Sequence, residues 1–219
     1  MRYLTILFTL FGVIANAQMT TQIATDSAVL KYHIGQYSYH ADFVNHKGYG
    51  APMILTNDGG GAVFGDGDDG SMLVRLNKAG KTTWKKTIPA KGEEMESQSV
   101  VEDKLGNFYV FILVHGLSEH RGGCERVVFL NKVGTIVWDK FIGTCQQLNN
   151  PTVDYIKALP DGRISLRGHV IKTKPPEGKD PTYLYWEGWL DKTGKLTQKA
   201  GQAIDWKKEA EWKALFKPE

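Results

Sequence analysis

Short runs of alternating apolar and polar residues, separated by residues that favour turns, fill most of the chain. In LVRLNKAGKTTWKK, residues 73–86, Val74 and Leu76 point to one side of an extended strand before the turn. Asn77 can bond the backbone two residues on, and Gly80 can supply the positive φ that closes a type I turn with a bulge. The stretch therefore predicts a tight β-hairpin.

This hairpin phrase occurs three times. VVFLNKVGTIVWDK covers residues 127–140, and WLDKTGKLTQKA covers residues 189–200. Alignment on the glycine superimposes four positions: Leu76, Leu130 and Leu190; Asn77, Asn131 and Asp191; Lys78, Lys132 and Lys192; Gly80, Gly134 and Gly194. These long separations indicate a repeating unit of several strands. Gln198 replaces the Trp84 and Trp138 of the earlier copies, which suggests a last unit with a less covered outer strand.

A second shared pattern precedes each hairpin. It is an Asp-Gly-type turn followed by a strand that ends in glycine, at residues 57–65, 104–116 and 160–168. Another short strand candidate comes before each turn, in APMILT, SQSVVE and VDYIKAL. The unit is therefore strand, Asp-Gly turn, strand, variable loop, strand, Asn-Lys-x-Gly turn, strand. Four antiparallel strands per repeat predict an all-β fold built from the blades of a β-propeller.

The pattern DGG…G…LVRLNKAGKTTWKK resembles the blades of bacterial secreted β-propellers. It is similar, more loosely, to the blades of pyrroloquinoline-quinone-type propellers. The resemblance covers about residues 50–200 and implies a β-propeller, or a propeller-like array, of four-stranded antiparallel blades. It implies no particular activity, because such blades are scaffolds that carry many functions.

Three blades over residues 50–200 fall short of the roughly four that a closed propeller needs. Within residues 18–49, the stretch AVLKYHIGQYSYHADFV is expected to form one or two strands, and the segment is a candidate for part of a fourth blade. Residues 201–219 are assigned to a short C-terminal helix, because Asp205 can cap it and Trp212 shares an apolar face with its neighbours. We expect this helix to cover an exposed edge of the array. We expect a monomer, or a dimer that completes the ring of blades.

Residues 1–17 have the pattern of a secretory signal peptide. They combine Arg2, an apolar run from Leu4 to Ile14 that is too short to span a bilayer, and a small-residue cleavage pattern. No cysteine follows the run, so a lipoprotein anchor is not expected. The sequence therefore predicts a secreted or periplasmic chain that begins at Gln18 and is not inserted in a membrane.

Cysteine and charge content refine this picture. The two cysteines, Cys124 and Cys145, are expected to form a disulfide because an oxidising compartment favours pairing, with two separate thiols as the alternative. The chain has 27 basic and 24 acidic residues, with the signs interspersed. Such a balance forms no basic stripe, so we expect no nucleic-acid partner.

Candidate chemistry is sparse. His33, His40, Asp42 and His46 match no established metal spacing, and FGDGDDGS at residues 64–71 departs from an EF-hand loop. The chain has no Gly-rich phosphate loop and no Gly-x-Ser-x-Gly elbow. We therefore expect no metal and no cofactor, and an enzyme is the less favoured hypothesis.

The run YLYWEGWL, residues 183–190, admits two interpretations. It could be an aromatic platform for a sugar. However, Tyr183 and Tyr185 fall on one face of the strand while Trp186 and Leu190 fall on the other, so both faces are apolar. This pattern favours a strand that is buried between neighbouring blades.

Loop variation suggests where a partner binds. The Asn-Lys-x-Gly turns are nearly uniform, whereas DGDDGS, LSEHRGGCE and KTKPPEGKDPT differ at the other end of the blades. Loops that vary carry recognition, so we expect a binding module for a protein or a glycan. The predicted binding residues are Asp68, Glu93, Glu119, His120, Arg121, Gln147, Asn149 and Lys174. The alternatives are an enzyme of quinoprotein or lyase type, or a protective, immunity-type partner of a secreted toxin.

Overall fold

The computed structural model describes residues 19–24, 27–34, 37–42, 52–67, 70–90, 94–115, 124–142, 152–173 and 182–204. These residues form only strands and turns, and none belongs to a helix that could cross a membrane. An N-terminal sheet contains β1 (Met19–Ala24), β2 (Ser27–Ile34) and β3 (Tyr37–Asp42). Three four-stranded antiparallel sheets follow it along the chain.

Each four-stranded sheet is formed by consecutive strands. The first sheet contains β4 (Met53–Leu55), β5 (Gly61–Gly67), β6 (Gly70–Leu76) and β7 (Thr82–Pro89). The second contains β8 (Glu94–Glu102), β9 (Phe108–His115), β10 (Cys124–Leu130) and β11 (Ile136–Ile142). The third contains β12 (Thr152–Ala158), β13 (Ile164–Thr173), β14 (Thr182–Leu190) and β15 (Leu196–Ile204). The all-β prediction and the four-stranded repeat are confirmed.

Both ends of the repeat region differ from the sequence prediction. The N-terminal segment forms the strands expected of AVLKYHIGQYSYHADFV, β2 and β3, and a further strand, β1, that the sequence did not predict. At the other end, residues 201–204 belong to β15, although they were assigned to the C-terminal helix. They remain extended because β14 is long enough to pair with them, Tyr183 with Ile204 and Leu184 with Ala203. The predicted helix itself falls on residues 205–219, which lie outside the described residues.

Six turns in the described part of the chain share one geometry. They cover residues 56–60, 77–81, 103–107, 131–135, 159–163 and 191–195. In each, the first residue's N–H donates to the carbonyl of the fifth, and the fourth residue's N–H donates to the carbonyl of the first. The fourth residue is always glycine, with φ between 73° and 86°. The predicted turn with a glycine in the left-handed region is thus confirmed.

Two side-chain arrangements stabilise this one turn. In four turns the first residue is Asn or Asp, as in Asn131, whose Oδ1 accepts from the N–H groups of Val133 and Thr135. In the other two, Asp58 or Asp161 occupies the third position and accepts from the fifth N–H instead. Either arrangement satisfies a backbone donor that would otherwise be exposed at the strand end.

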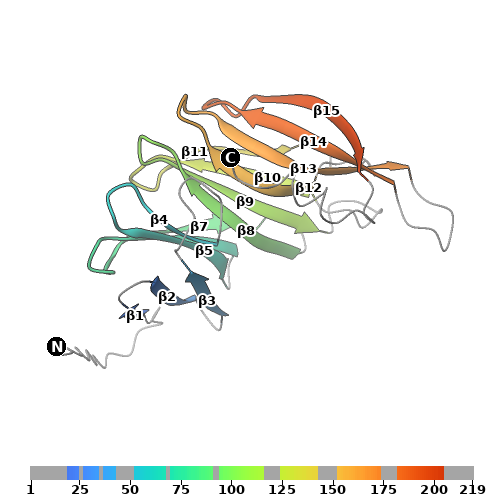
Figure 1. Ribbon diagram of the computed structural model, residues 1–219. Helices are drawn as coiled ribbons and strands as arrows, with labels where there is room; N and C mark the ends of the chain where they lie inside the picture. The colour runs from blue at the N-terminus through green and yellow to red at the C-terminus, as the bar shows by residue number, and fades with distance from the viewer. Residues whose placement is uncertain are drawn as a thin grey trace.

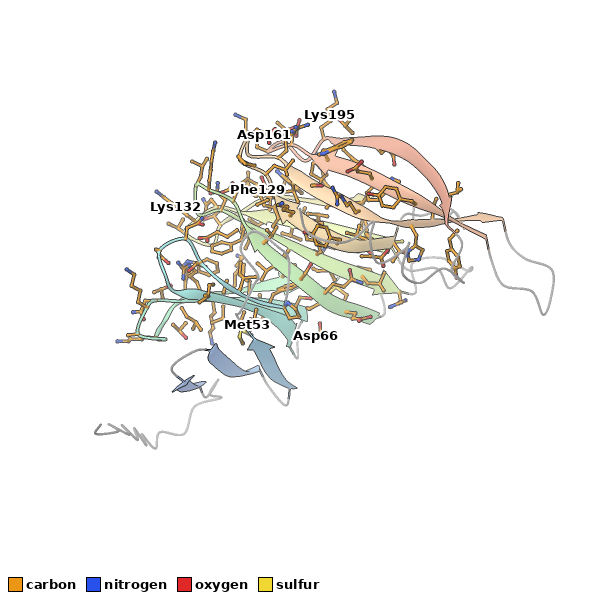
Figure 2. The ribbon with its side chains drawn as sticks, in the orientation of Figure 1. Met53, Asp66, Phe129, Lys132, Asp161 and Lys195 are labelled. Carbon is orange, nitrogen blue, oxygen red and sulfur yellow. The ribbon has the colours of Figure 1, made fainter. Side chains whose placement is uncertain are left out.

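The turns define the two ends of the sheets. Because consecutive antiparallel strands alternate in direction, all six turns lie at one end, which we call the turn end. The connections at residues 68–69, 90–93, 116–123, 143–151 and 174–181 start from strand ends at the opposite side, the loop end. In Figure 2, Lys132, Asp161 and Lys195 mark the turn end and Asp66 marks the loop end of the first sheet.

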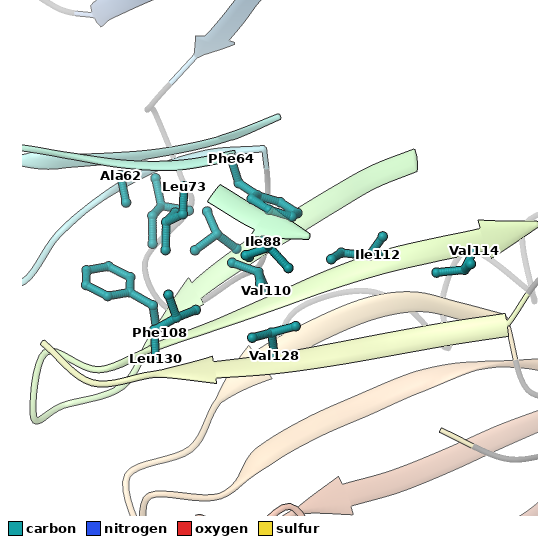
Figure 3. Close-up of a cluster of buried hydrophobic side chains, with 12 residues drawn as sticks. Ala62, Phe64, Leu73, Ile88, Phe108, Val110, Ile112, Val114, Val128 and Leu130 are labelled. Atoms are coloured by element: carbon teal, nitrogen blue, oxygen red, sulfur yellow. The ribbon is translucent and has the colours of Figure 1, made fainter. Parts of the chain in front are cut away.

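The sheets stack on one another in chain order (Figure 1). Alternate residues of β9 face opposite ways: Phe108 and Val110 pack toward the first sheet, and Tyr109 and Phe111 pack toward the third. All four are fully buried, and each such side chain contributes about 1.5–3 kcal/mol relative to exposure. The second sheet is therefore covered on both faces, which explains the unbroken apolar run FYVFILV. Figure 3 shows the core between the first two sheets.

A tryptophan and a glycine connect neighbouring sheets at the turn end. A Cβ on Gly134 would lie 3.0 Å from the ring of Trp84, and a Cβ on Gly194 would lie 3.1 Å from the ring of Trp138. Each tryptophan therefore lies under the turn of the next sheet. The equivalent Gln198 instead accepts a hydrogen bond at 2.9 Å from Trp186 of its own sheet. Among the described residues no four-stranded sheet follows the third, so position 198 has no turn of a next sheet to support.

Replacing Gly134 with valine is expected to lower the free energy of unfolding by about 1–3 kcal/mol. The φ of +82° is unfavourable for a β-branched residue, and the new side chain would meet Trp84. Chemical denaturation would measure the effect. The matched control is Gly162→Val, which has a similar φ of +86° but nothing within 4 Å of a Cβ. Equal losses in the two variants would show that Trp84 adds no restraint.

The aromatic run of β14 is only partly consistent with burial between blades. Trp186 and Leu190 are buried in the core against the second sheet. Tyr183, Tyr185 and Trp189 lie on the opposite face and are half-buried. In the part of the chain that the structure describes, no further four-stranded sheet packs on that face. The prediction therefore holds for one face of the strand.

Candidate functional site

All eight residues predicted to bind a partner lie outside the described residues: Asp68, Glu93, Glu119, His120, Arg121, Gln147, Asn149 and Lys174. They therefore stay a prediction. The same holds for the disulfide, because Cys145 also lies outside that part, whereas Cys124 is buried at the start of β10. Among the described residues, charged and hydrogen-bonding side chains gather in two regions, one at each end of the sheets.

At the loop end, a carboxylate reaches across each interface between four-stranded sheets. Asp66 Oδ1 accepts at 2.8 Å from the N–H of Ser97, and Glu125 Oε1 accepts at 3.2 Å from the N–H of Val153. Both donors lie on the first strand of the following sheet, immediately before a β-bulge. Each carboxylate thus accepts from a backbone N–H on the edge strand of the next sheet, next to the point where the register of that strand shifts.

The two carboxylates come from different strands. Asp66 lies on β5 opposite Ser71, whereas Glu125 lies on β10 opposite Leu113 of β9. Alignment on the turns makes Asp66 equivalent to Leu113 and Ser71 equivalent to Glu125. The acid of the second sheet therefore lies one strand further along than the acid of the first sheet, but it accepts from the N–H at the equivalent position of the following sheet. Side chains directly opposite each other in a sheet share a face, so either position reaches the next sheet.

Glu125 is an unusual member of this region. It is 1% exposed, and its Oε2 has no hydrogen-bond partner. Burial raises the pKa of Glu125 to about 8. The hydrogen bond from Val153 acts in the opposite direction, and the negative charges of Asp154 and Glu96 raise the pKa further. The carboxyl group is therefore largely protonated at neutral pH.

Next to Glu125, Arg126 points toward the first sheet. Its guanidinium is fully buried and donates to both carboxylate oxygens of Asp139, at 2.9 and 2.8 Å. A third bond, at 2.8 Å, goes to the carbonyl of Pro89 at the end of β7. Arg126 therefore joins the first and second sheets near the loop end.

The third sheet has different side chains at the positions equivalent to these carboxylates. His169 and Tyr185 lie opposite each other, at the positions equivalent to Asp66 and Ser71. His169 Nδ1 lies 2.6 Å from Asp154 Oδ2, within the same sheet. On the same face, Arg167 Nε lies 3.4 Å from Glu187 Oε1. The outer face of the third sheet therefore combines polar side-chain pairs with aromatic rings.

At the turn end, a groove of about 570 Å³ lies between the first and second sheets. The first sheet contributes Asn57, Asp58, Arg75, Asn77, Thr83 and Trp84, and the second contributes Glu102, Lys104, Leu105, Gly106, Lys132 and Val133. Leu105 and Val133 are 69% and 64% exposed at the tips of their turns. The volume lies in the range of small-molecule sites.

An ion pair forms one wall of this groove. Asp58 Oδ1 accepts from Gly60 N at 3.0 Å, from Arg75 at 2.6 Å and from Thr56 Oγ1 at 2.8 Å. These bonds, led by that from Gly60, lower the pKa of Asp58 to about 2, so the carboxylate is ionised at any ordinary pH. Arg75 itself is almost buried and also donates to the carbonyls of Gly61 and Leu76.

The opposite wall contains a partly desolvated acid. Glu102 Oε2 accepts at 2.6 Å from the N–H of Asn57, and the Asn57 side chain donates at 2.7 Å to the carbonyl of Asp103. Burial raises the pKa of Glu102, partly offset by the bond from Asn57 and the charge of Arg75. These bonds fix the two sheets relative to each other beneath the groove.

Sequence reasoning missed the groove because it assigned recognition to the variable end. The available signal was departure from the repeat: Leu105 and Val133 place large apolar residues at a turn tip where the other copies have Asp, Thr or Ala. Among the described residues, no cluster of three or more His, Cys, Asp or Glu could hold a metal ion. No protein-family model and no curated protein matches the chain.

Proposed function

We propose that this protein is a secreted or periplasmic binding module that recognises a protein or glycan partner through the connections at its loop end. The sheets would act as the blades of a propeller-like scaffold. The observation that carries the proposal is the difference between the two ends: one geometry recurs in all six described turns, whereas the connections opposite them vary in length and sequence.

Physical requirements on the two ends support this assignment. The turns must keep their shape because neighbouring sheets pack through them, as Gly134 packs on Trp84. The connections at the loop end leave from strands that are already fixed by the two cores and by the buried Arg126. A rigid frame with variable connections is the usual construction of a recognition surface.

The test uses two multiple variants of the full exported chain in a pull-down from the periplasmic or extracellular fraction, alongside a glycan array. One variant replaces the eight predicted loop residues, from Asp68 to Lys174, with alanine. The other replaces Lys78 and Lys192 at the turn end. We expect the first to lose the partner and the second to retain it, with both still folded by circular dichroism. The reverse result would show that the partner binds at the turn end.

A further inference from the structure

The two interfaces between four-stranded sheets differ at the turn end. At the second interface, Trp138 Nε1 donates to the carbonyl of Lys192 at 3.0 Å, and Lys140 Nζ donates to the carbonyl of Thr193 at 2.9 Å. These bonds close the turn of the third sheet onto the second.

At the first interface the equivalent donors are Trp84 and Lys86. Among the residues that the structure describes, neither donates to any acceptor, and Trp84 lines the groove. The turn at residues 131–135 approaches the ring of Trp84 closely at Gly134. The first interface therefore lacks the side-chain bonds that close the second, and the Trp84 side chain lines the groove there.

Hydrogen-bond acceptors lie across the groove from this donor. All three bonds that Asp58 accepts end on Oδ1, so Oδ2 stays available on a side chain that is 68% exposed. Glu102 uses Oε2 for the Asn57 N–H, which leaves Oε1. With the Lys132 ammonium group, the groove offers both acceptors and donors over a short span.

The mixture of charges restricts the chemistry of a ligand. A phosphate or carboxylate would meet the Asp58 carboxylate, which stays ionised. A cation would meet the positive charges of Arg75 and Lys132. A neutral ligand rich in hydroxyl groups avoids both conflicts, because each hydroxyl can donate to a carboxylate and accept from an indole or an ammonium group.

We propose that the turn-end groove is a binding site for a neutral saccharide. Asp58 and Glu102 accept from its hydroxyl groups, Trp84 and Lys132 donate to them, and the apolar side chains of Leu105 and Val133 border the ring. This site lies at the opposite end from the loops of the proposed function and does not depend on them.

The experiment is a titration of the full chain with glucose, galactose, N-acetylglucosamine, maltose and cellobiose, followed by tryptophan fluorescence and calorimetry. We expect millimolar or tighter binding of at least one of these sugars. Trp84→Phe keeps an aromatic ring but removes the N–H donor together with part of the ring surface, so the Kd should rise about fivefold. Asp58→Asn removes a charged acceptor, so the Kd should rise about tenfold or more.

The matched control is Trp138→Phe. Its indole N–H is already engaged by Lys192, so the Kd of the sugar should not change. Denaturation midpoints verify that each variant is folded, and Lys132→Ala provides a second, surface substitution that should weaken binding without affecting the fold.

Three results would overturn the proposal. The first is no binding of any of the five sugars at millimolar concentration. The second is equal weakening by Trp84→Phe and Trp138→Phe. The third is loss of sugar binding in the loop-end variant with Trp84→Phe unaffected, which would move the saccharide to the other end.

Discussion

Replacing Asp139 with alanine should lower the free energy of unfolding by about 3–5 kcal/mol, because it leaves the guanidinium of Arg126 buried without its counter-ion. The Arg126 side chain is 0% exposed and that of Asp139 only 20% exposed, so water replaces the lost carboxylate poorly. The remaining bonds to the carbonyl of Pro89 and to the sulfur of Met95 do not balance the charge. Urea denaturation of the two proteins would measure the difference.

Two controls separate the buried charge from a general loss of packing. The double variant Arg126→Met, Asp139→Ala removes both charges and should recover much of the lost stability, since an apolar side chain can fill the same interface. Arg163→Ala breaks an ion pair whose partners are 50% and 51% exposed while leaving the turn bond that Asp161 accepts, and it should shift the denaturation midpoint much less. If Asp139→Ala unfolds at the wild-type midpoint, Arg126 is not held by this pair.

The repeat predicted the four-stranded unit correctly because its residues act locally. Asn131 and Gly134 stabilise a turn through bonds within five residues, so their identity and spacing are visible in the sequence. The sequence of β9 was less informative about which residues face which sheet, because a strand that is buried on both faces shows no alternation of apolar and polar residues. Its position in the middle of the stack follows only from contacts with both neighbouring sheets.

Interactions between sheets were not predictable from the repeat alone. At the first interface the acid that accepts a hydrogen bond from the next sheet is Asp66, and at the second it is Glu125. The two residues lie on strands that occupy different positions in the repeat, the second strand and the third. An alignment of the copies compares Asp66 with Leu113 and finds no shared chemistry. Only the pairing of Leu113 with Glu125 in the structure shows that the neighbouring strand supplies the acid in the second sheet.

The groove was hidden for a related reason. Trp84 and Trp138 are identical in the repeat, and the sequence gives no reason to distinguish them. They differ because Trp138 donates to the turn of the third sheet whereas Trp84 has no acceptor in the described part of the chain. Equivalent residues in a repeat can thus be structural at one interface and available for binding at the next.

The second large effect concerns pH and Glu125. We expect the free energy of unfolding to fall by about 3–5 kcal/mol between pH 4.5 and pH 8 on account of this residue alone. Over this range the folded protein keeps the proton on Glu125, whose pKa is raised to about 8, whereas the unfolded chain has lost it near the ordinary value of 4.5. Because the folded state binds more protons, stability is greatest below the unfolded pKa and declines as the pH rises toward the folded one.

Glu125→Gln tests this assignment, because glutamine keeps an acceptor for the N–H of Val153 but cannot ionise. Urea denaturation at a series of pH values should give a flatter stability profile for the variant than for the wild type, with the two curves converging or crossing as the pH increases. The decisive quantity is the difference in slope between pH 5 and pH 8, since other titrating groups contribute equally to both proteins. Parallel profiles would mean that Glu125 ionises in the folded protein as it does in the unfolded chain, and that its burial between the second and third sheets is not maintained in solution.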